Sequence, residues 1–163
     1  MNEKSLLNGK KILIVDDEPD VLETLQELLS MGEIETASTF DQAKELIETN
    51  NYDFAILDIM GVDGYRLLEF TTGKGITTVM LTAHALSPDN VVKSYQQGAA
   101  SYIPKDEMVH IVTYLEDIVE AQKQGKNPWW RWYDRLAGFF EKKFGMEWQE
   151  NNREFWEKFR YHI

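Results

Sequence analysis

Short apolar runs that end in polar side chains alternate along the chain with segments in which apolar residues recur every three or four positions. The segment 11–15 is short, rich in β-branched residues and followed at once by acids, which is typical of a buried strand. Comparable runs predict four further strands, at 34–38, 54–57, 77–81 and 101–103.

The segments between these strands have helical periodicity. Apolar positions spaced by three or four residues predict helices at 19–31, 41–49, 65–71, 88–97 and 108–119. Regular alternation of strand and helix over about 120 residues predicts a parallel sheet with helices on both faces. We expect a doubly wound, five-stranded α/β sheet with strand order 2-1-3-4-5, because the second strand ends in Ser38 and Thr39 and adds no charged group.

A polar stretch at 123–128 separates this α/β part from a segment of different composition. It contains Gly125 and Pro128, so we place a linker there. The boundaries predicted from it are a domain at 9–122 and a helical tail at 129–163.

The tail is unusually aromatic. Residues 127–163 contain 12 aromatic residues, including all five tryptophans of the chain. Their spacing predicts one helix that begins at Pro128 and ends at Gly145, and a second helix capped by Asn151 or Asn152.

The composition of the chain excludes several classes of function. The chain has no cysteine, which excludes disulfides, thiolate metal sites and thiol nucleophiles. Its apolar runs are far shorter than the roughly 20 residues of a membrane-spanning helix, and its N-terminus lacks the apolar core of a signal peptide, so we expect a cytoplasmic protein. The net charge is −11, and residues 1–120 hold 8 Lys/Arg against 22 Asp/Glu, a balance that disfavours nucleic-acid binding.

Polar side chains follow four of the five predicted strands: Asp16 and Asp17, Asp58, Thr82, and Lys105. Ligands of such sheets bind outside the carboxyl ends of the strands, so we expect these residues to share one crevice. Two carboxylates 4 Å apart repel by about 4 kcal/mol at an effective dielectric constant near 20, so the cluster needs a cation or raised pKa values. Hard oxygen ligands without His or Cys suit Mg²⁺.

This ordered set makes the chain resemble the receiver domain of two-component response regulators. The matching segments are the acidic pair in LIVDDEP, the aspartate in AILDIM, the threonine in VMLTAHA and the lysine after SYIP. The resemblance covers about residues 9–122. It implies a flavodoxin-like fold and a phosphorylation-controlled regulator that signals through protein–protein contacts, with no enzymatic activity beyond its own Mg²⁺-dependent phosphorylation and dephosphorylation.

By the same resemblance, Asp58 is the phosphoacceptor and takes a phosphoryl group from a sensor histidine kinase or a phosphotransfer protein. Asp16 and Asp17 are expected to hold Mg²⁺ together with Asp58 and the backbone carbonyl of Met60. A carboxylate nucleophile of this kind needs no base to activate it.

Three further residues are expected to respond to the phosphoryl group. The resemblance makes Thr82 the hydroxyl that turns toward it, Lys105 its ammonium partner, and Tyr102 the aromatic switch whose rotamer follows Thr82. The chain departs from the family in two places. The turn after Met60 is about two residues shorter than usual, and Lys105 is followed by Asp106 instead of proline.

Other functions remain open at this point. A receiver-like scaffold could keep the fold without phosphorylation. An aspartate-nucleophile phosphohydrolase would need a second acid where Met60 stands, and an FMN carrier would need a phosphate cradle where the acids 16–18 stand. The three histidines His84, His110 and His162 are too scattered for a metal site.

The tail allows several interpretations too. It could be a helical hairpin packed on the domain or on itself, a docking or dimerisation surface, or, less favourably because of its acids, a membrane-surface helix. We expect a downstream protein target or a second copy of the chain to bind through the 101–122 face or the 129–163 tail.

Overall fold

The computed structural model describes residues 5–162, with side chains as far as residue 159. The side chains of Tyr161 and His162 therefore lie outside the described residues. None of the helices in this described part of the chain has the length and apolar character needed to cross a bilayer.

Five parallel strands form one sheet in the order β2-β1-β3-β4-β5, which confirms the predicted topology. Their bounds are β1 Lys11–Val15, β2 Glu33–Ala37, β3 Phe54–Asp58, β4 Thr77–Thr82 and β5 Ser101–Pro104. In the register of β3 and β4, Asp58 pairs with Leu81, so Thr82 lies one residue further along. The polar residues that follow or end β1, β3, β4 and β5 therefore lie together at the carboxyl ends of the strands.

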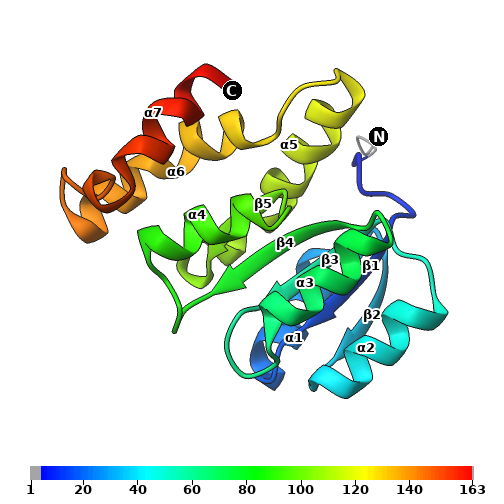
Figure 1. Cartoon of the computed structure of the whole chain (residues 1–163). Helices are drawn as coiled ribbons and strands as arrows, with labels where there is room; N and C mark the ends of the chain where they lie inside the picture. Colours follow the sequence, from blue (N-terminus) through cyan, green and yellow to red (C-terminus); the bar gives the residue numbers. More distant parts are fainter. Residues whose placement is uncertain (1–4, 163) are drawn as a thin grey trace.

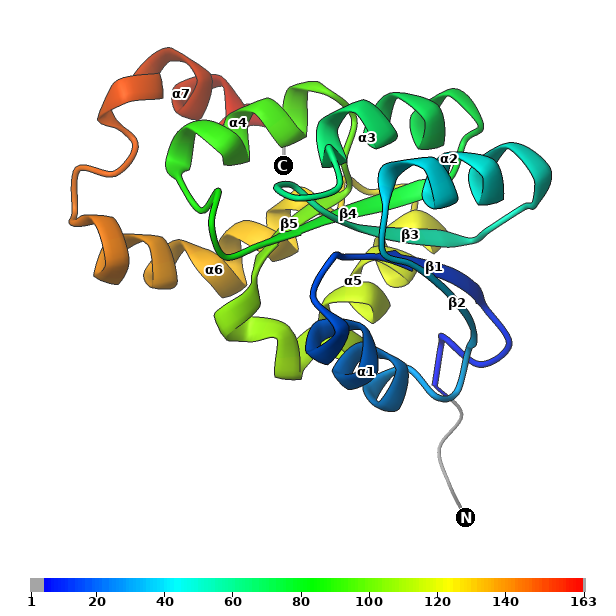
Figure 2. The same ribbon diagram turned by 90° about the horizontal axis from the view of Figure 1, so that it is seen from below.

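Helices cover both faces of the sheet (Figures 1 and 2). Helices α2, α3 and α4 lie on one face and α1 and α5 on the other, as Figure 2 shows. Their bounds are α1 Pro19–Leu28, α2 Phe40–Thr49, α3 Gly64–Gly73, α4 Pro88–Gln96 and α5 Ile111–Lys123. Proline occupies the first turn of α1 and α4, and the Ser87 hydroxyl accepts a hydrogen bond from Asn90 N at the start of α4.

One predicted helix begins later than its periodicity suggested. The expectation placed Met108 in the last helix of the domain, but a 3₁₀ helix, η1, spans Lys105–His110 and α5 begins at Ile111. None of the side chains of η1 is buried, whereas Ile111, the first residue of α5, is fully buried.

The tail forms two helices, α6 Trp129–Phe144 and α7 Arg153–His162, with a 3₁₀ helix, η2 Glu150–Asn152, between them. Gly145 has φ +92° and ends α6, as its position predicted. The side-chain amide of Asn152, one of the two expected helix caps, donates a hydrogen bond to Asp89 Oδ1 in α4 at 2.6 Å.

The two edge strands of the sheet differ in burial because only one of them is covered. In β2 only Ala37 is buried, whereas all four residues of β5 are buried. Helix α6 lies against β5, and Figure 2 shows it alongside that strand. The tail therefore packs both on itself and on the domain, which was one of the interpretations that the sequence left open.

Candidate functional site

The ammonium group of Lys105 lies among three carboxylates at the carboxyl ends of the strands. Its Nζ atom is 2.8 Å from Asp16 Oδ2, 2.9 Å from Glu18 Oε1 and 3.6 Å from Asp58 Oδ1. Asp16 and Asp58 are almost fully buried. The structure therefore brings together the predicted residues of β1, β3 and β5.

Asp16 contacts both its own loop and Lys105. Its Oδ1 atom accepts a hydrogen bond from Glu18 N at 2.9 Å. Its Oδ2 atom is buried and lies 2.8 Å from Lys105 Nζ, in a close ion pair. Burial raises the pKa of Asp16, and Lys105 opposes this effect.

The pKa of Asp58 is strongly raised. Burial is the main cause, and the charge of Asp16 adds to it, so the pKa of Asp58 rises to about 7 although Lys105 acts in the opposite direction. Near neutral pH, protein charges alone leave much of this carboxyl group protonated. A further cation in the pocket would favour the ionised form, which is the form that can act as a nucleophile.

The donor set fits a hard divalent cation. Asp16, Asp17 and Glu18 each offer a carboxylate oxygen within 4.8 Å of the others. All of these donors are oxygens, which Mg²⁺ prefers. Glu18, which the resemblance did not include, belongs to this group, whereas Asp58 does not meet the same distance limit.

The short turn after Asp58 leaves no space beside Asp17. Gly61 has φ +86°, and a Cβ atom placed on it would lie 2.5 Å from Asp17 Oδ2. Asp63, the residue before α3, has a left-handed conformation with φ 55°. Met60 enters this turn with an exposed side chain, and the role expected of its backbone carbonyl stays a prediction.

Thr82 and Tyr102 are linked through the loop between β4 and α4 and are both fully buried. The Thr82 hydroxyl accepts a hydrogen bond from Ala85 N at 3.0 Å. The Tyr102 hydroxyl donates to Ala85 O at 2.8 Å and accepts from Ser87 N at 3.2 Å. The structure thus places Tyr102 next to the loop that follows Thr82, while the switching role expected of both residues stays a prediction.

The sequence interpretation missed two contributors to this site. Glu18 binds the Lys105 ammonium, and Ala85 connects Thr82 to Tyr102 through its backbone. The position of Glu18 directly after the acidic pair was a usable signal for the first. A contact made by backbone atoms, such as that of Ala85, cannot be predicted from the type of side chain at that position. His84 Nε2 lies 4.0 Å from Glu18 Oε1 at the mouth of the pocket.

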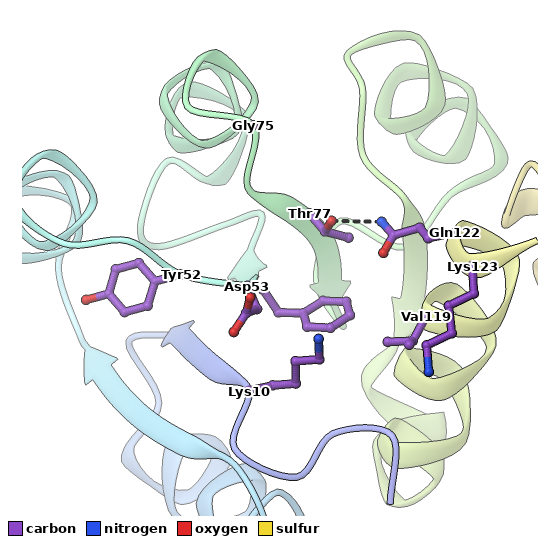
Figure 3. Close-up of a pocket in the computed structure, with 9 residues that line it drawn as sticks. Lys10, Tyr52, Asp53, Gly75, Thr77, Val119, Gln122 and Lys123 are labelled. Atoms are coloured by element: carbon purple, nitrogen blue, oxygen red, sulfur yellow. Dashed lines mark hydrogen bonds between the residues drawn. The ribbon is translucent and has the colours of Figure 1, made fainter. Parts of the chain in front are cut away.

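A separate cavity lies at the amino ends of the strands, where β1, β3 and β4 begin (Figure 3). Its volume is about 400 Å³, and Lys10, Asp53 and Lys123 contribute charged groups to its lining. Gln122 Nε2 donates a hydrogen bond to Thr77 Oγ1 across one side of it. This cavity contains none of the residues that the sequence marked as functional.

Comparisons with known proteins agree with one another. The sequence model of the response regulator receiver domain matches residues 12–116. The chain is 33% identical over 103 residues to the two-component response regulator ARR18 of Arabidopsis thaliana, covering 60% of this chain and 16% of that protein. It is 31% identical over 127 residues to the DNA-binding transcriptional regulator NtrC of Escherichia coli, covering 71% and 27%. This chain therefore spans less than a third of either relative.

A solved structure supports the same assignment. The CheY-like response regulator receiver domain protein from Methanospirillum hungatei is 30% identical, with a TM-score of 0.60, over 72% of this chain and 99% of that one. A two-component response regulator from Clostridium difficile, at 21% identity and a TM-score of 0.63, shares the fold.

Proposed function

The chain belongs to the response regulator receiver family, and on that premise we propose that Asp58 accepts a phosphoryl group from a sensor histidine kinase or a phosphotransfer protein. The single observation that carries this proposal is the burial of Asp58 beside the Lys105 ammonium at the carboxyl edge of the sheet. We also propose that the protein acts in the cytoplasm.

The proposed reaction uses three side chains of this protein. A carboxylate oxygen of Asp58 attacks the phosphorus atom, a P–O bond forms, and the P–N bond to the donor imidazole breaks, after which the imidazole takes up a proton. Lys105 is close enough to Asp58 Oδ1, at 3.6 Å, to reach an oxygen of the transferred group. The Thr82 hydroxyl is the proposed second contact of that group.

Receiver domains bind Mg²⁺ at an acidic site, and the acids of this chain fit that ion. We assign Asp16, Asp17 and Asp58, with the backbone carbonyl of Met60, as the residues that hold it. When bound, Mg²⁺ neutralises negative charge on the transferring phosphoryl oxygens. The proposed activity goes no further than phosphorylation and dephosphorylation of the chain itself.

Intact-mass measurement after incubation with acetyl phosphate and Mg²⁺ tests the proposal. We expect one added phosphoryl group on the wild type and none on Asp58→Asn. Asp63→Asn is the matched control, because it removes a carboxylate from the same turn and asparagine tolerates the left-handed conformation. Wild-type protein that stays unmodified by acetyl phosphate and by sensor kinases would identify a receiver-like scaffold instead.

A further inference from the structure

The tail binds the main chain at the edge of the sheet. Trp132 Nε1 donates a hydrogen bond to the carbonyl oxygen of Tyr102 at 2.6 Å, and Trp129 Nε1 donates to Ala99 O at 2.9 Å. Both tryptophan side chains are buried. Helix α6 is therefore held on β5 by directional bonds as well as by apolar contact.

The same tail also contacts the helices on either side of β5. The ring of Tyr95 in α4 has three aromatic neighbours from the tail at centroid distances of 5.3, 5.3 and 5.5 Å: Trp129, Phe155 and Phe159. In α5, Asp117 accepts two hydrogen bonds from the Arg135 guanidinium. The tail thus covers one continuous face made of α4, β5 and α5, and Figure 1 shows both tail helices on this side of the molecule.

This arrangement changes how the expected interaction surfaces must be understood. The 101–122 face and the 129–163 tail were expected as separate places for a partner to bind. In the structure each covers the other, so the described tail occupies the face that a partner would use.

Tyr102 belongs to both the covered face and the loop beside the phosphorylation pocket. Its backbone carbonyl binds Trp132, and its ring lies 6.2 Å from that of Phe140 in α6. Its hydroxyl binds Ala85 O, and Ala85 N in turn donates to the Thr82 hydroxyl. A short series of bonds therefore connects Thr82 to α6.

We infer that the aromatic tail is an intramolecular partner of the α4–β5–α5 face, and that phosphorylation of Asp58 weakens its docking through Thr82, Ala85 and Tyr102. The inference rests on the proposed function. A Thr82 hydroxyl that turns toward a phosphoryl group leaves Ala85 N without its acceptor. The loop that binds the Tyr102 hydroxyl then loses one of its hydrogen bonds. Tyr102 is also the residue that Trp132 and Phe140 contact when the tail is docked.

Coupling between two binding events is reciprocal, so the docked tail must also oppose occupation of the pocket by the same factor. Couplings of this kind typically amount to about 5- to 150-fold. The aromatic contacts at Tyr95 and Tyr102 favour the docked state. Phosphorylation therefore increases the fraction of molecules with an undocked tail without detaching it permanently.

Hydrogen exchange of the indole N–H groups of Trp129 and Trp132, followed by NMR in the full chain, tests this inference. The comparison is between Mg²⁺ alone and Mg²⁺ with beryllofluoride, a phosphoryl mimic. We expect both indole protons to exchange about 5- to 150-fold faster with beryllofluoride, while amides of α2, which packs beside β2 at the other end of the strand order, keep their rates.

The reciprocal experiment uses a matched pair of variants. Trp132→Phe removes the N–H donor to Tyr102 and keeps an aromatic ring, so we expect a severalfold higher affinity for beryllofluoride. Trp148→Phe makes the same chemical change at a buried tryptophan whose ring contacts are with Tyr133, Phe140 and Trp156, all in the tail, and should keep the wild-type affinity.

The outcomes separate the two proposals. Beryllofluoride binding with unchanged or slower indole exchange would overturn the inference about the tail and leave the proposed function intact. Failure of beryllofluoride to bind, together with no mass change from acetyl phosphate, would overturn the proposed function and the inference with it. Equal affinities of Trp132→Phe and Trp148→Phe would also contradict the coupling.

Discussion

Lys105 carries the only described ammonium group that contacts the buried acids Asp16 and Asp58. Its Nζ atom lies closer to Glu18 Oε1, at 2.9 Å, than to Asp58 Oδ1, at 3.6 Å. Burial raises the pKa of Asp58 most, the charge of Asp16 adds to this rise, and Lys105 opposes it. The way in which three carboxylates share the Lys105 ammonium therefore contributes to the acidity of the proposed nucleophile.

The raised pKa of Asp58 predicts a pH-dependent stability effect. The ionised carboxyl of Asp58 is disfavoured in the folded state, which lowers the free energy of unfolding. This loss of stability is absent below the unfolded pKa of 3.8 and fully present above the folded pKa of about 7. In EDTA, Asp58→Asn should therefore be more stable than the wild type at pH 8, by about 4 kcal/mol at most, and the difference should shrink toward pH 4.5. Urea unfolding at both pH values measures it.

Asp134→Asn is the control for this pH experiment, because Asp134 is exposed on α6. Its stability should follow that of the wild type at both pH values. A gain for Asp58→Asn that is the same at pH 4.5 and pH 8 would contradict the assignment of the raised pKa.

Glu18 offers a second test at this scale. Glu18→Gln removes one of the carboxylates that hold Lys105, so the ammonium can move closer to Asp58 and favour its ionised form. We expect phosphorylation by acetyl phosphate to become faster, by about fivefold at most, because partly exposed ion pairs are worth about 0.2–1 kcal/mol. Glu23→Gln, an exposed position of α1, makes the same charge change and should leave the rate unaltered.

At the scale of elements, the turn between β3 and α3 is the part of the site most restricted by backbone geometry. Gly61→Ala should strain the left-handed conformation and push the Asp17 carboxylate aside, because the added Cβ atom would lie 2.5 Å from Asp17 Oδ2. We expect Mg²⁺ affinity, measured by calorimetry, to fall about tenfold or more.

Gly138→Ala provides the matched control for Gly61→Ala. A Cβ atom on Gly138, in the middle of α6, would have nothing within 4 Å. This variant should keep the Mg²⁺ affinity and gain about 0.5–1 kcal/mol in stability from helix propensity. Similar Mg²⁺ affinities in the two variants would argue against Asp17 as a ligand.

The contact between α5 and α6 depends on one buried carboxylate. Asp117 is 7% exposed and accepts hydrogen bonds from Arg135, whereas Glu120 on the same helix is exposed and lies 3.8 Å from Arg131. Asp117→Asn should lower the free energy of unfolding by about 1–3 kcal/mol, and Glu120→Gln by less than about 1 kcal/mol. Urea titrations that give equal losses would contradict the structural role of Asp117.

At the scale of the whole molecule, the boundaries predicted from the sequence stay a proposal: a domain at 9–122, a linker at 123–128 and a tail at 129–163. The buried contacts of α6 and α7 with α4, β5 and α5 predict that domain and tail unfold together. All five tryptophans lie in the tail, so their fluorescence reports on it, while far-UV circular dichroism reports mainly on the larger domain. We expect the two urea transitions to coincide.

A fluorescence transition at clearly lower urea than the dichroism transition would indicate that the tail unfolds by itself. In that case the contacts at Trp129 and Trp132 would contribute little to stability, and the boundary at 123–128 would separate two independent units.

The sheet and the acidic pocket were predictable because each signal is local. Strands such as 54–57 are apolar and short, each ends in its functional side chain, and the parallel topology then brings those ends together. The place of the tail was not predictable in the same way. The spacing of Trp129, Trp132 and Phe140 indicates a helix face that must be buried, but it contains no information about which surface buries it. The hydrogen bonds to Ala99 O and Tyr102 O depend on backbone atoms that every residue possesses.

Only residues 124–128 separate the end of α5 from the start of α6. A tether this short keeps the tail near its binding face at an effective concentration in the millimolar range. A free protein at micromolar concentration that competes for the same face must therefore bind it about a thousandfold more tightly than the tail does. Lengthening this connection with flexible residues would lower that threshold and make the face easier to reach for weaker competitors.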